Sequence, residues 1–151
     1  MLGITSLDVD NYKKNGFTVS NSQLSEGLFD SINHSYNEFI DKNKDLTLEE
    51  MASPHLMSGA GLKHNKSKEL CESFLKIGKN NEIVSQVKKI LGDDIILWGM
   101  HCMHKEAKTG KKIPWHQDGT YWPIEPKATC SVWIAITDVD ESNGCMRFIP
   151  K

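Results

Sequence analysis

The stretch Asp94-Ile-Ile-Leu-Trp-Gly-Met-His-Cys-Met-His104 decides the fold, because the hydrophobic pattern changes there from helical to extended. Before it, apolar residues recur every three or four positions. After it, they run almost without interruption in Thr129-Cys-Ser-Val-Trp-Ile-Ala-Ile136, which indicates a strand buried on both faces. The sequence therefore predicts an α+β fold in a single domain, mainly helical over residues 1–92 and built from strands over residues 93–151.

The helical part is expected to contain four helices with recognisable start or stop signals. Asn15-Gly16 closes the first helix and Gly92 closes the last, because glycine adopts the left-handed conformation that ends a helix. Asn21 or Ser22 is expected to cap the second helix, which carries one apolar stripe as far as Ile40. The first, third and fourth helices are predicted over residues 8–14, 67–77 and 81–91, a loop over most of 41–61, and strands over 17–20, 94–104, 129–136 and 145–149.

Length and composition exclude several classes of protein. The 151 residues suffice for one domain with a core, and a formal net charge of −2 argues against nucleic acid as a partner. The first ten residues have no signal-peptide pattern, and the longest apolar run, residues 95–100, is too short to span a membrane. The four cysteines are widely spaced, so we expect reduced thiols in a cytoplasmic protein.

The chemistry is expected in Pro114-Trp-His-Gln-Asp-Gly-Thr-Tyr-Trp-Pro123. In an extended segment, residues i and i+2 point to the same side, so the His116 and Asp118 side chains converge while Gln117 points away. One imidazole and one carboxylate on one face are two of the three ligands in the 2-His-1-carboxylate site of non-haem iron oxygenases. His116 and Asp118 are therefore candidate iron ligands.

The His-x-Asp pair has a plainer interpretation, since so short a pattern also occurs by chance. Asp118 could simply accept a hydrogen bond from a neighbouring backbone N–H in a surface turn. Trp115, Tyr121 and Trp122 favour a site that lines a pocket, because three aromatic side chains beside the pair are costly to leave exposed.

A second candidate pair, Cys102 and His104, lies two residues apart on one face of a predicted strand and could hold zinc. The favoured interpretation is that Cys102 is a small buried side chain and His104 a polar residue at the strand end. His101 falls on the opposite face of that strand, so it cannot complete such a site.

Five blocks of sequence, in their order and spacing, resemble the phytanoyl-CoA dioxygenase family of iron(II)/2-oxoglutarate oxygenases. The resemblance is clear over residues 91–151, and the helical part agrees only in type. The blocks are Leu91-Gly-Asp-Asp-Ile-Ile-Leu-Trp98, the loop 105–112, Trp115-His-Gln-Asp118 with Tyr121 and Pro123, Val132-Trp-Ile-Ala-Ile136, and Asn143-Gly-Cys-Met-Arg-Phe-Ile-Pro150.

The resemblance implies a double-stranded β-helix with the N-terminal helices packed on its outer sheet. It makes His116 and Asp118 iron(II) ligands and places Trp133 and His101 beside 2-oxoglutarate. The implied reaction uses O2 and 2-oxoglutarate to hydroxylate a small molecule or an acyl derivative and releases succinate, with ascorbate a candidate stimulant. Asp118 favours hydroxylation or desaturation, because related halogenases leave the carboxylate position open for chloride.

Two features of the family are missing from these 151 residues. The second iron histidine and the arginine that binds the 2-oxoglutarate carboxylate follow the Asn-Gly block in the family, and Arg147, the only arginine, precedes that position. We therefore expect the N-terminal portion of an oxygenase domain, inactive by itself. The alternatives are a non-catalytic metal-binding or interaction module of the same fold, and a zinc hydrolase that uses His116, Asp118 and His104.

Overall fold

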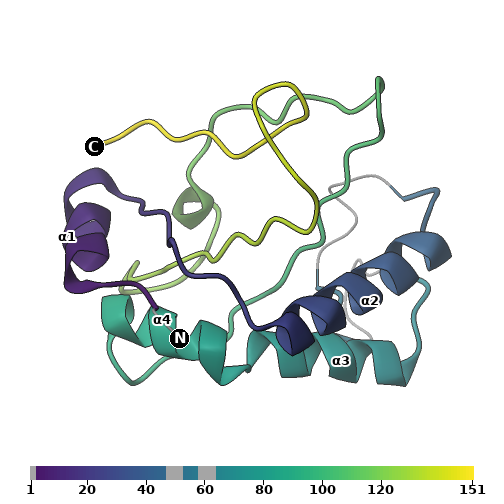
Figure 1. Cartoon of the computed structure of the whole chain (residues 1–151), viewed down its shortest axis with the longest axis horizontal. Coiled ribbons are helices and arrows are strands. Elements are labelled where there is room, and N and C mark those ends of the chain that lie inside the picture. Colours follow the sequence, from purple (N-terminus) through teal and green to yellow (C-terminus); the bar gives the residue numbers. More distant parts are fainter. Residues whose placement is uncertain (1–2, 47–52, 58–63) are drawn as a thin grey trace. The chain divides into compact units, whose positions relative to one another are not determined.

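The computed structural model of the chain describes residues 3–46, 53–57 and 64–151. It divides into two compact units. The core unit comprises Gln23–Val84 and Ile96–Lys105, and the motif unit comprises Met1–Ser22, Ser85–Ile95 and Glu106–Lys151. The helices in chain order are α1 (Ser6–Asn15), α2 (Glu26–Lys42), α3 (Lys68–Gly78), α4 (Asn81–Leu91), which the two units share, and the short 3-10 helix η2 (Asp118–Thr120) (Figure 1).

Helix α1 ends where the sequence predicts but starts earlier, at Ser6 instead of residue 8. Thr5 and Asp8 form a capping box, in which the Thr5 amide donates to the Asp8 carboxylate at 2.7 Å and the Asp8 amide donates to the Thr5 hydroxyl at 3.2 Å. Gly16 ends the helix with φ of 84°, and its amide donates to the Tyr12 carbonyl at 2.8 Å. The predicted Asn-Gly stop is confirmed.

Helix α2 begins later than predicted, because Ser25 and neither Asn21 nor Ser22 is its N-cap. The Ser25 hydroxyl accepts a hydrogen bond from the Leu28 amide. The Ser25 amide in turn donates to the Glu82 carboxylate at 2.8 Å, across 57 residues of sequence. Asn21, Ser22 and Ser25 are all residue types that cap helices, and of the three the structure uses Ser25, which also makes this distant contact.

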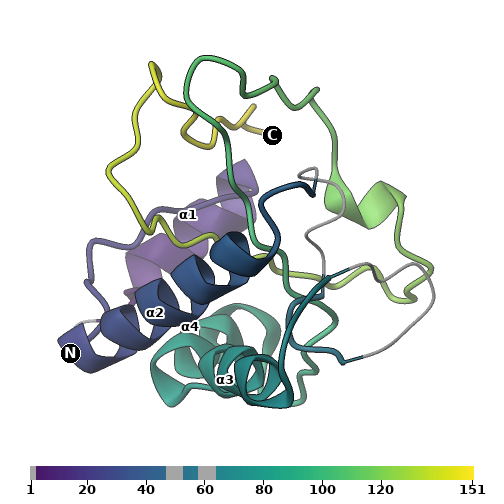
Figure 2. The ribbon, with the colours of Figure 1, turned by 90° about the vertical axis from the view of Figure 1, so that its right-hand side faces the viewer.

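The core of the core unit lies between α2 and α3, which run side by side (Figures 1 and 2). Phe39 is fully buried and meets Phe74 edge to face, with 5.7 Å between ring centroids. Leu28 and Ile32 of α2 are buried on the same stripe, which confirms the predicted apolar face. Because α3 presents a matching stripe that includes Leu70, the two helices bury each other.

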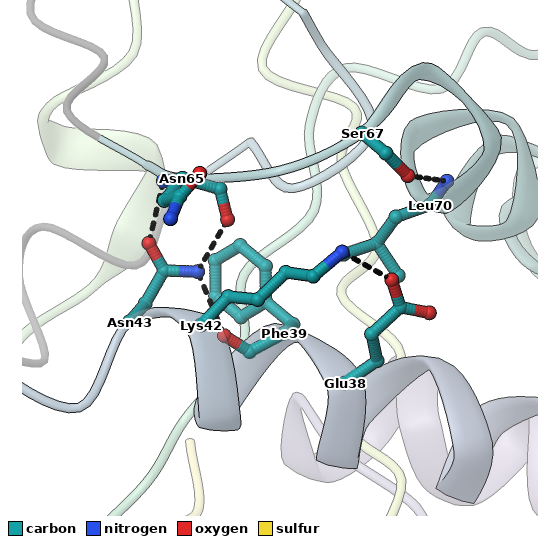
Figure 3. Close-up of polar contacts among 7 residues, drawn as sticks. All are labelled: Glu38, Phe39, Lys42, Asn43, Asn65, Ser67 and Leu70. Atoms are coloured by element: carbon teal, nitrogen blue, oxygen red, sulfur yellow. Dashed lines mark hydrogen bonds and ion pairs between the residues drawn. The ribbon is translucent and has the colours of Figure 1, made fainter.

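A buried asparagine fixes the chain at the end of α2 (Figure 3). The Asn43 side-chain amide donates to the Phe39 carbonyl at 2.7 Å and to the Asn65 carbonyl at 3.0 Å. Its side-chain oxygen accepts from the Asn65 amide at 2.6 Å. Asn43 is only 4% exposed, so these contacts satisfy a polar group that burial would otherwise penalise.

The predicted Gly92 stop is confirmed, and two further polar residues stand at helix starts. Ser67 caps α3 with its hydroxyl, which accepts from the Leu70 amide at 3.2 Å. Asn80 stands just before α4, where its side-chain oxygen accepts from the Glu82 amide at 2.8 Å. Gly92 follows α4 with φ of 95°, as expected for a stop. Within the described ranges, no helix combines the length and apolar character needed to cross a membrane.

The strand predictions are not confirmed. No described residue belongs to a β-strand, and residues 94–151 contain only η2, an isolated bridge at His101 and turns within otherwise irregular chain (Figure 1). The double-stranded β-helix of the predicted fold class is therefore not observed in the described residues, whereas its helical part is. A strand needs a neighbour to pair with its backbone N–H and C=O groups, so an apolar pattern alone does not produce one.

Burial in these segments corrects two expectations and supports a third. Residues 129–136 are not buried on both faces, since Val132 is 50% and Trp133 41% exposed. The sequence also favours a core position for Trp98 over a substrate-binding one, and Trp98 is instead 53% exposed. The period of two does survive locally, because Cys102 is buried at 6% beside Met103 at 42%. Cys102 is thus the small buried side chain that the sequence favoured.

Candidate functional site

The His-x-Asp segment is shaped by one residue of extended chain followed by a tight turn. Gln117 has φ of −122° and ψ of 122°, and η2 begins at Asp118. The Thr120 amide donates to the Gln117 carbonyl at 3.1 Å, and the Tyr121 amide donates to the Asp118 carbonyl at 3.0 Å. The extended Gln117 brings its two neighbours to one side, as predicted, and the turn fixes the backbone of the second.

The His116 and Asp118 side chains meet, with His116 Nε2 3.2 Å from Asp118 Oδ1. His116 Nδ1 lies 2.9 Å from the Pro114 carbonyl oxygen. Since a carbonyl only accepts, Nδ1 carries a proton and donates, which leaves Nε2 available as a ligand atom when the ring is neutral. The Ser131 hydroxyl donates to Asp118 Oδ2 at 3.1 Å, which leaves Oδ1 directed at the imidazole.

This geometry is compatible with a shared metal ion. Two ligand atoms about 2.1 Å from an ion and at right angles to each other are about 3.0 Å apart. The observed 3.2 Å between Nε2 and Oδ1 is close to that value. Among the residues that the structure describes, no group of three or more histidine, cysteine, aspartate or glutamate side chains could hold a metal ion, so the pair is the whole ligand set found there.

The predicted aromatic pocket does not enclose the pair. Trp115 is 56% and Tyr121 71% exposed, and the Tyr121 ring lies tilted 6.4 Å from the His116 ring. A cavity of about 360 Å³ adjoins the turn, and neither His116 nor Asp118 lines it. Its lining residues are Tyr12, Gly16, Gln117, Gly119, Thr120, Lys127, Thr129 and Lys151.

The other predicted site residues are distributed over both units. Trp133 belongs to the motif unit, is 41% exposed and follows Ser131 by two residues. His101 belongs to the core unit and is exposed beside the buried Cys102. Of the predicted residues, the structure brings together His116 and Asp118, whose Nε2 and Oδ1 atoms lie 3.2 Å apart.

The Cys102/His104 zinc interpretation does not fit its surroundings. Burial raises the pKa of the Cys102 thiol to about 12, so it stays protonated, whereas zinc binds the thiolate. His104 Nδ1 lies 2.8 Å from the Tyr36 hydroxyl, within hydrogen-bonding distance. The structure therefore favours the interpretation of Cys102 as a small buried side chain and of His104 as a polar residue, not as zinc ligands.

Sequence reasoning did not identify two groups that orient the pair. Ser131 contacts Asp118 Oδ2, and the Pro114 carbonyl contacts His116 Nδ1. Ser131 is thirteen residues from Asp118 and sits in an apolar segment, so no spacing rule links the two. The carbonyl of Pro114 belongs to the backbone, which every residue type shares. A pattern of side chains carries no signal for either contact.

A family model described as phytanoyl-CoA dioxygenase (PhyH) matches residues 12–151. The chain is 35% identical over 54 residues to phytanoyl-CoA dioxygenase domain-containing protein 1 homolog of Dictyostelium discoideum, which is 36% of this chain and 19% of that protein. It is 30% identical over 79 residues to phytanoyl-CoA dioxygenase domain-containing protein 1 of Danio rerio, which is 51% of this chain and 27% of that protein.

It is also 30% identical over 83 residues to an ectoine dioxygenase of Stutzerimonas stutzeri, which is 52% of this chain and 28% of that protein. The matched segments thus span less than a third of the length of these curated relatives. No solved structure matches the chain significantly.

Proposed function

Because this chain belongs to the phytanoyl-CoA dioxygenase family, we propose that His116 and Asp118 hold iron(II) in a 2-oxoglutarate-dependent oxygenase. The observation that carries the proposal is the 3.2 Å approach of His116 Nε2 to Asp118 Oδ1, close to the spacing of two neighbouring ligands on one ion. The family match supports the choice of metal, since the pair is one imidazole and one carboxylate of a 2-His-1-carboxylate site.

The residues of this chain would hold and orient the metal. His116, with its Nδ1 proton on the Pro114 carbonyl, presents a neutral Nε2 lone pair. Asp118 adds a negative charge that offsets part of the charge of the ion. When bound, iron(II) supplies the redox chemistry that couples decarboxylation of 2-oxoglutarate to oxidation of a substrate by O2. A third protein ligand completes the proposed site.

We place the cosubstrate beside Trp133 and His101 and take the substrate to be a small molecule or an acyl derivative that is hydroxylated. The family resemblance supports these assignments. One relative is named an ectoine dioxygenase, which is consistent with a small substrate. No name among the relatives points to ascorbate, so ascorbate forms no part of the proposal.

A non-catalytic metal-binding module is the second candidate, and one observation favours it. In the described residues the site has two ligands that remain 39% and 47% exposed, so water competes with both. Exposed ligands bind a metal weakly and do not exclude solvent from a reacting oxidant. The zinc hydrolase, which would use His116, Asp118 and His104, finds no such support, because these three side chains form no metal-binding group in the described residues.

The test of the metal site uses Mn(II), which binds the same ligand types and broadens nearby NMR signals. We expect saturable broadening of the backbone amide signals of residues 116–119 in the wild-type chain. His116→Ala and Asp118→Ala should each abolish it, because one remaining ligand does not hold the ion. His34→Ala is the control, since His34 is an exposed histidine on α2. Unchanged binding in Asp118→Ala would show that the ligand assignment is wrong.

The oxygenase and the binding module are separated by their products. Iron(II) and 2-oxoglutarate are added to the protein, and succinate is measured. Metal-dependent succinate formation that disappears in Asp118→Ala supports the oxygenase. Saturable metal binding at the pair with no succinate, in a protein that also supplies the third ligand, supports the module.

A further inference from the structure

The Asp118 carboxylate has two chemically equivalent oxygens, and the structure makes them unequal. Oδ1 faces His116 Nε2 at 3.2 Å, and Oδ2 accepts a hydrogen bond from Ser131 Oγ at 3.1 Å. The last torsion of an aspartate side chain is broad and two-fold, so nothing within Asp118 itself holds one oxygen in place. The Ser131 hydroxyl supplies the missing constraint.

A contact of this kind also joins two segments of the motif unit. Ser131 lies thirteen residues beyond Asp118 and two residues before Trp133. The hydrogen bond therefore fixes η2, which carries the carboxylate, to the segment that carries the tryptophan expected beside the cosubstrate. A displacement of one segment would therefore act on the position of the other through this hydrogen bond.

We infer that Ser131 is a positioning residue that directs Asp118 Oδ1 at the metal by holding Asp118 Oδ2. The inference rests on the proposed metal site. Partners of metal ligands in the outer shell fix the orientation of the ligand, and their loss typically weakens metal binding about 10–100-fold. Here the loss would free the carboxylate to rotate, so that the ligand atom must be ordered again each time the ion binds.

The Pro114 carbonyl holds His116 in the same way, through Nδ1 at 2.9 Å. In each residue of the pair, one atom is held by a hydrogen bond, His116 Nδ1 by Pro114 and Asp118 Oδ2 by Ser131. The other atom, His116 Nε2 or Asp118 Oδ1, is directed at the proposed metal position. Backbone groups are not removed by substitution, so Ser131 is the contact that an experiment can delete cleanly. Ser131 is exposed and its change leaves no buried cavity.

The experiment compares Ser131→Thr with Ser131→Val in the Mn(II) titration of the whole chain. Threonine and valine have the same shape, and only threonine has a hydroxyl. We expect Ser131→Thr to bind within about twofold of the wild type and Ser131→Val to bind about tenfold more weakly. The thermal unfolding midpoint without metal should be the same for both, which separates positioning from a general loss of structure.

Ser142→Ala is the matched control, because the Ser142 hydroxyl donates to the Asp140 carboxylate at 2.6 Å in the same unit. It removes a serine–aspartate hydrogen bond away from the pair and should leave the Mn(II) affinity unchanged. Equal affinities of the Thr and Val variants, with binding still lost in Asp118→Ala, would overturn the inference and leave the metal site intact. Unchanged binding in Asp118→Ala would remove the metal site itself, and the role of Ser131 with it.

Discussion

The two units differ in how much apolar surface they bury. Of the ten buried apolar side chains among the described residues, Pro54 included, nine lie in the core unit and only Ile4 lies in the motif unit. The motif unit instead exposes Trp133, Phe148 and Ile149. The candidate metal ligands belong to the unit with little apolar core, where hydrogen bonds hold the side chains in place.

The difference between the units follows from how the helical and the β sequence patterns bury apolar side chains. A helix satisfies its own backbone groups, so α2 and α3 need only each other to bury their stripes. A segment with the β pattern has no internal hydrogen bonds and buries its side chains only within a paired sheet. The motif unit therefore keeps its geometry through polar contacts such as that between Ser131 and Asp118.

The largest expected effect is on Phe39, which is 0% exposed between α2 and α3. Phe39→Ala should lower the free energy of unfolding by about 3–5 kcal/mol, since it leaves a cavity and removes the contact with Phe74. The measurement is urea unfolding followed by far-UV circular dichroism, which reports the helices.

Ile149→Ala is the matched change in the motif unit, at a side chain that is 72% exposed. It should shift the free energy of unfolding by no more than about 0.5 kcal/mol. Similar losses in the Phe39 and Ile149 variants would break the comparison between the two units.

The second effect concerns the buried amide of Asn43. Asn43→Ala leaves the Asn65 amide and the Phe39 carbonyl without their partner, and should cost about 1–3 kcal/mol. Asn37→Ala is the control, because the Asn37 side chain makes an exposed bond to Asn33 on the same helix. Equal unfolding midpoints for the two variants would contradict a structural role for the buried amide.

The smallest effect is the pH dependence that Glu82 gives to the core unit. Hydrogen bonds from the Ser25 side chain, then from its backbone, lower the pKa of Glu82 below its ordinary value of 4.5. The ionised carboxylate therefore stabilises the fold above pH 4.5, and this contribution disappears as the pH falls through the lowered pKa. Glu82→Gln should be less stable than the wild type at pH 7, and the difference should shrink below pH 4.5.

Asp140 is the comparison for Glu82 in the motif unit. Its pKa is also lowered, first by the Ser142 side chain, but its partners lie within three residues. Asp140→Asn should leave the global unfolding midpoint almost unchanged at every pH, because a local turn does not connect distant parts of the chain. A pH-dependent loss as large as that of Glu82→Gln would show that the motif unit is held by more than local contacts.

The helices could be predicted from sequence because their signals are local. The Asn15-Gly16 stop and the Gly92 stop depend on residues within one turn of the helix end. The Ser25 cap was not predicted, because Ser25 is held by Glu82, which lies 57 residues away in the sequence. The strands predicted from sequence are not observed in the described residues, because pairing is a property of two segments and the apolar pattern of one segment does not contain its partner.

The sequence by itself determined the four helices, the family and the convergence of His116 with Asp118, because each follows from residues close together in the chain. Only the tertiary structure decided that Ser131 holds Asp118 Oδ2, that Glu82 holds the Ser25 cap of α2, and that Trp133 stays partly exposed. The physical reason is range. Capping, helical period and the two-residue spacing act within a few residues, whereas burial and long-range hydrogen bonds need a partner that only folding brings near.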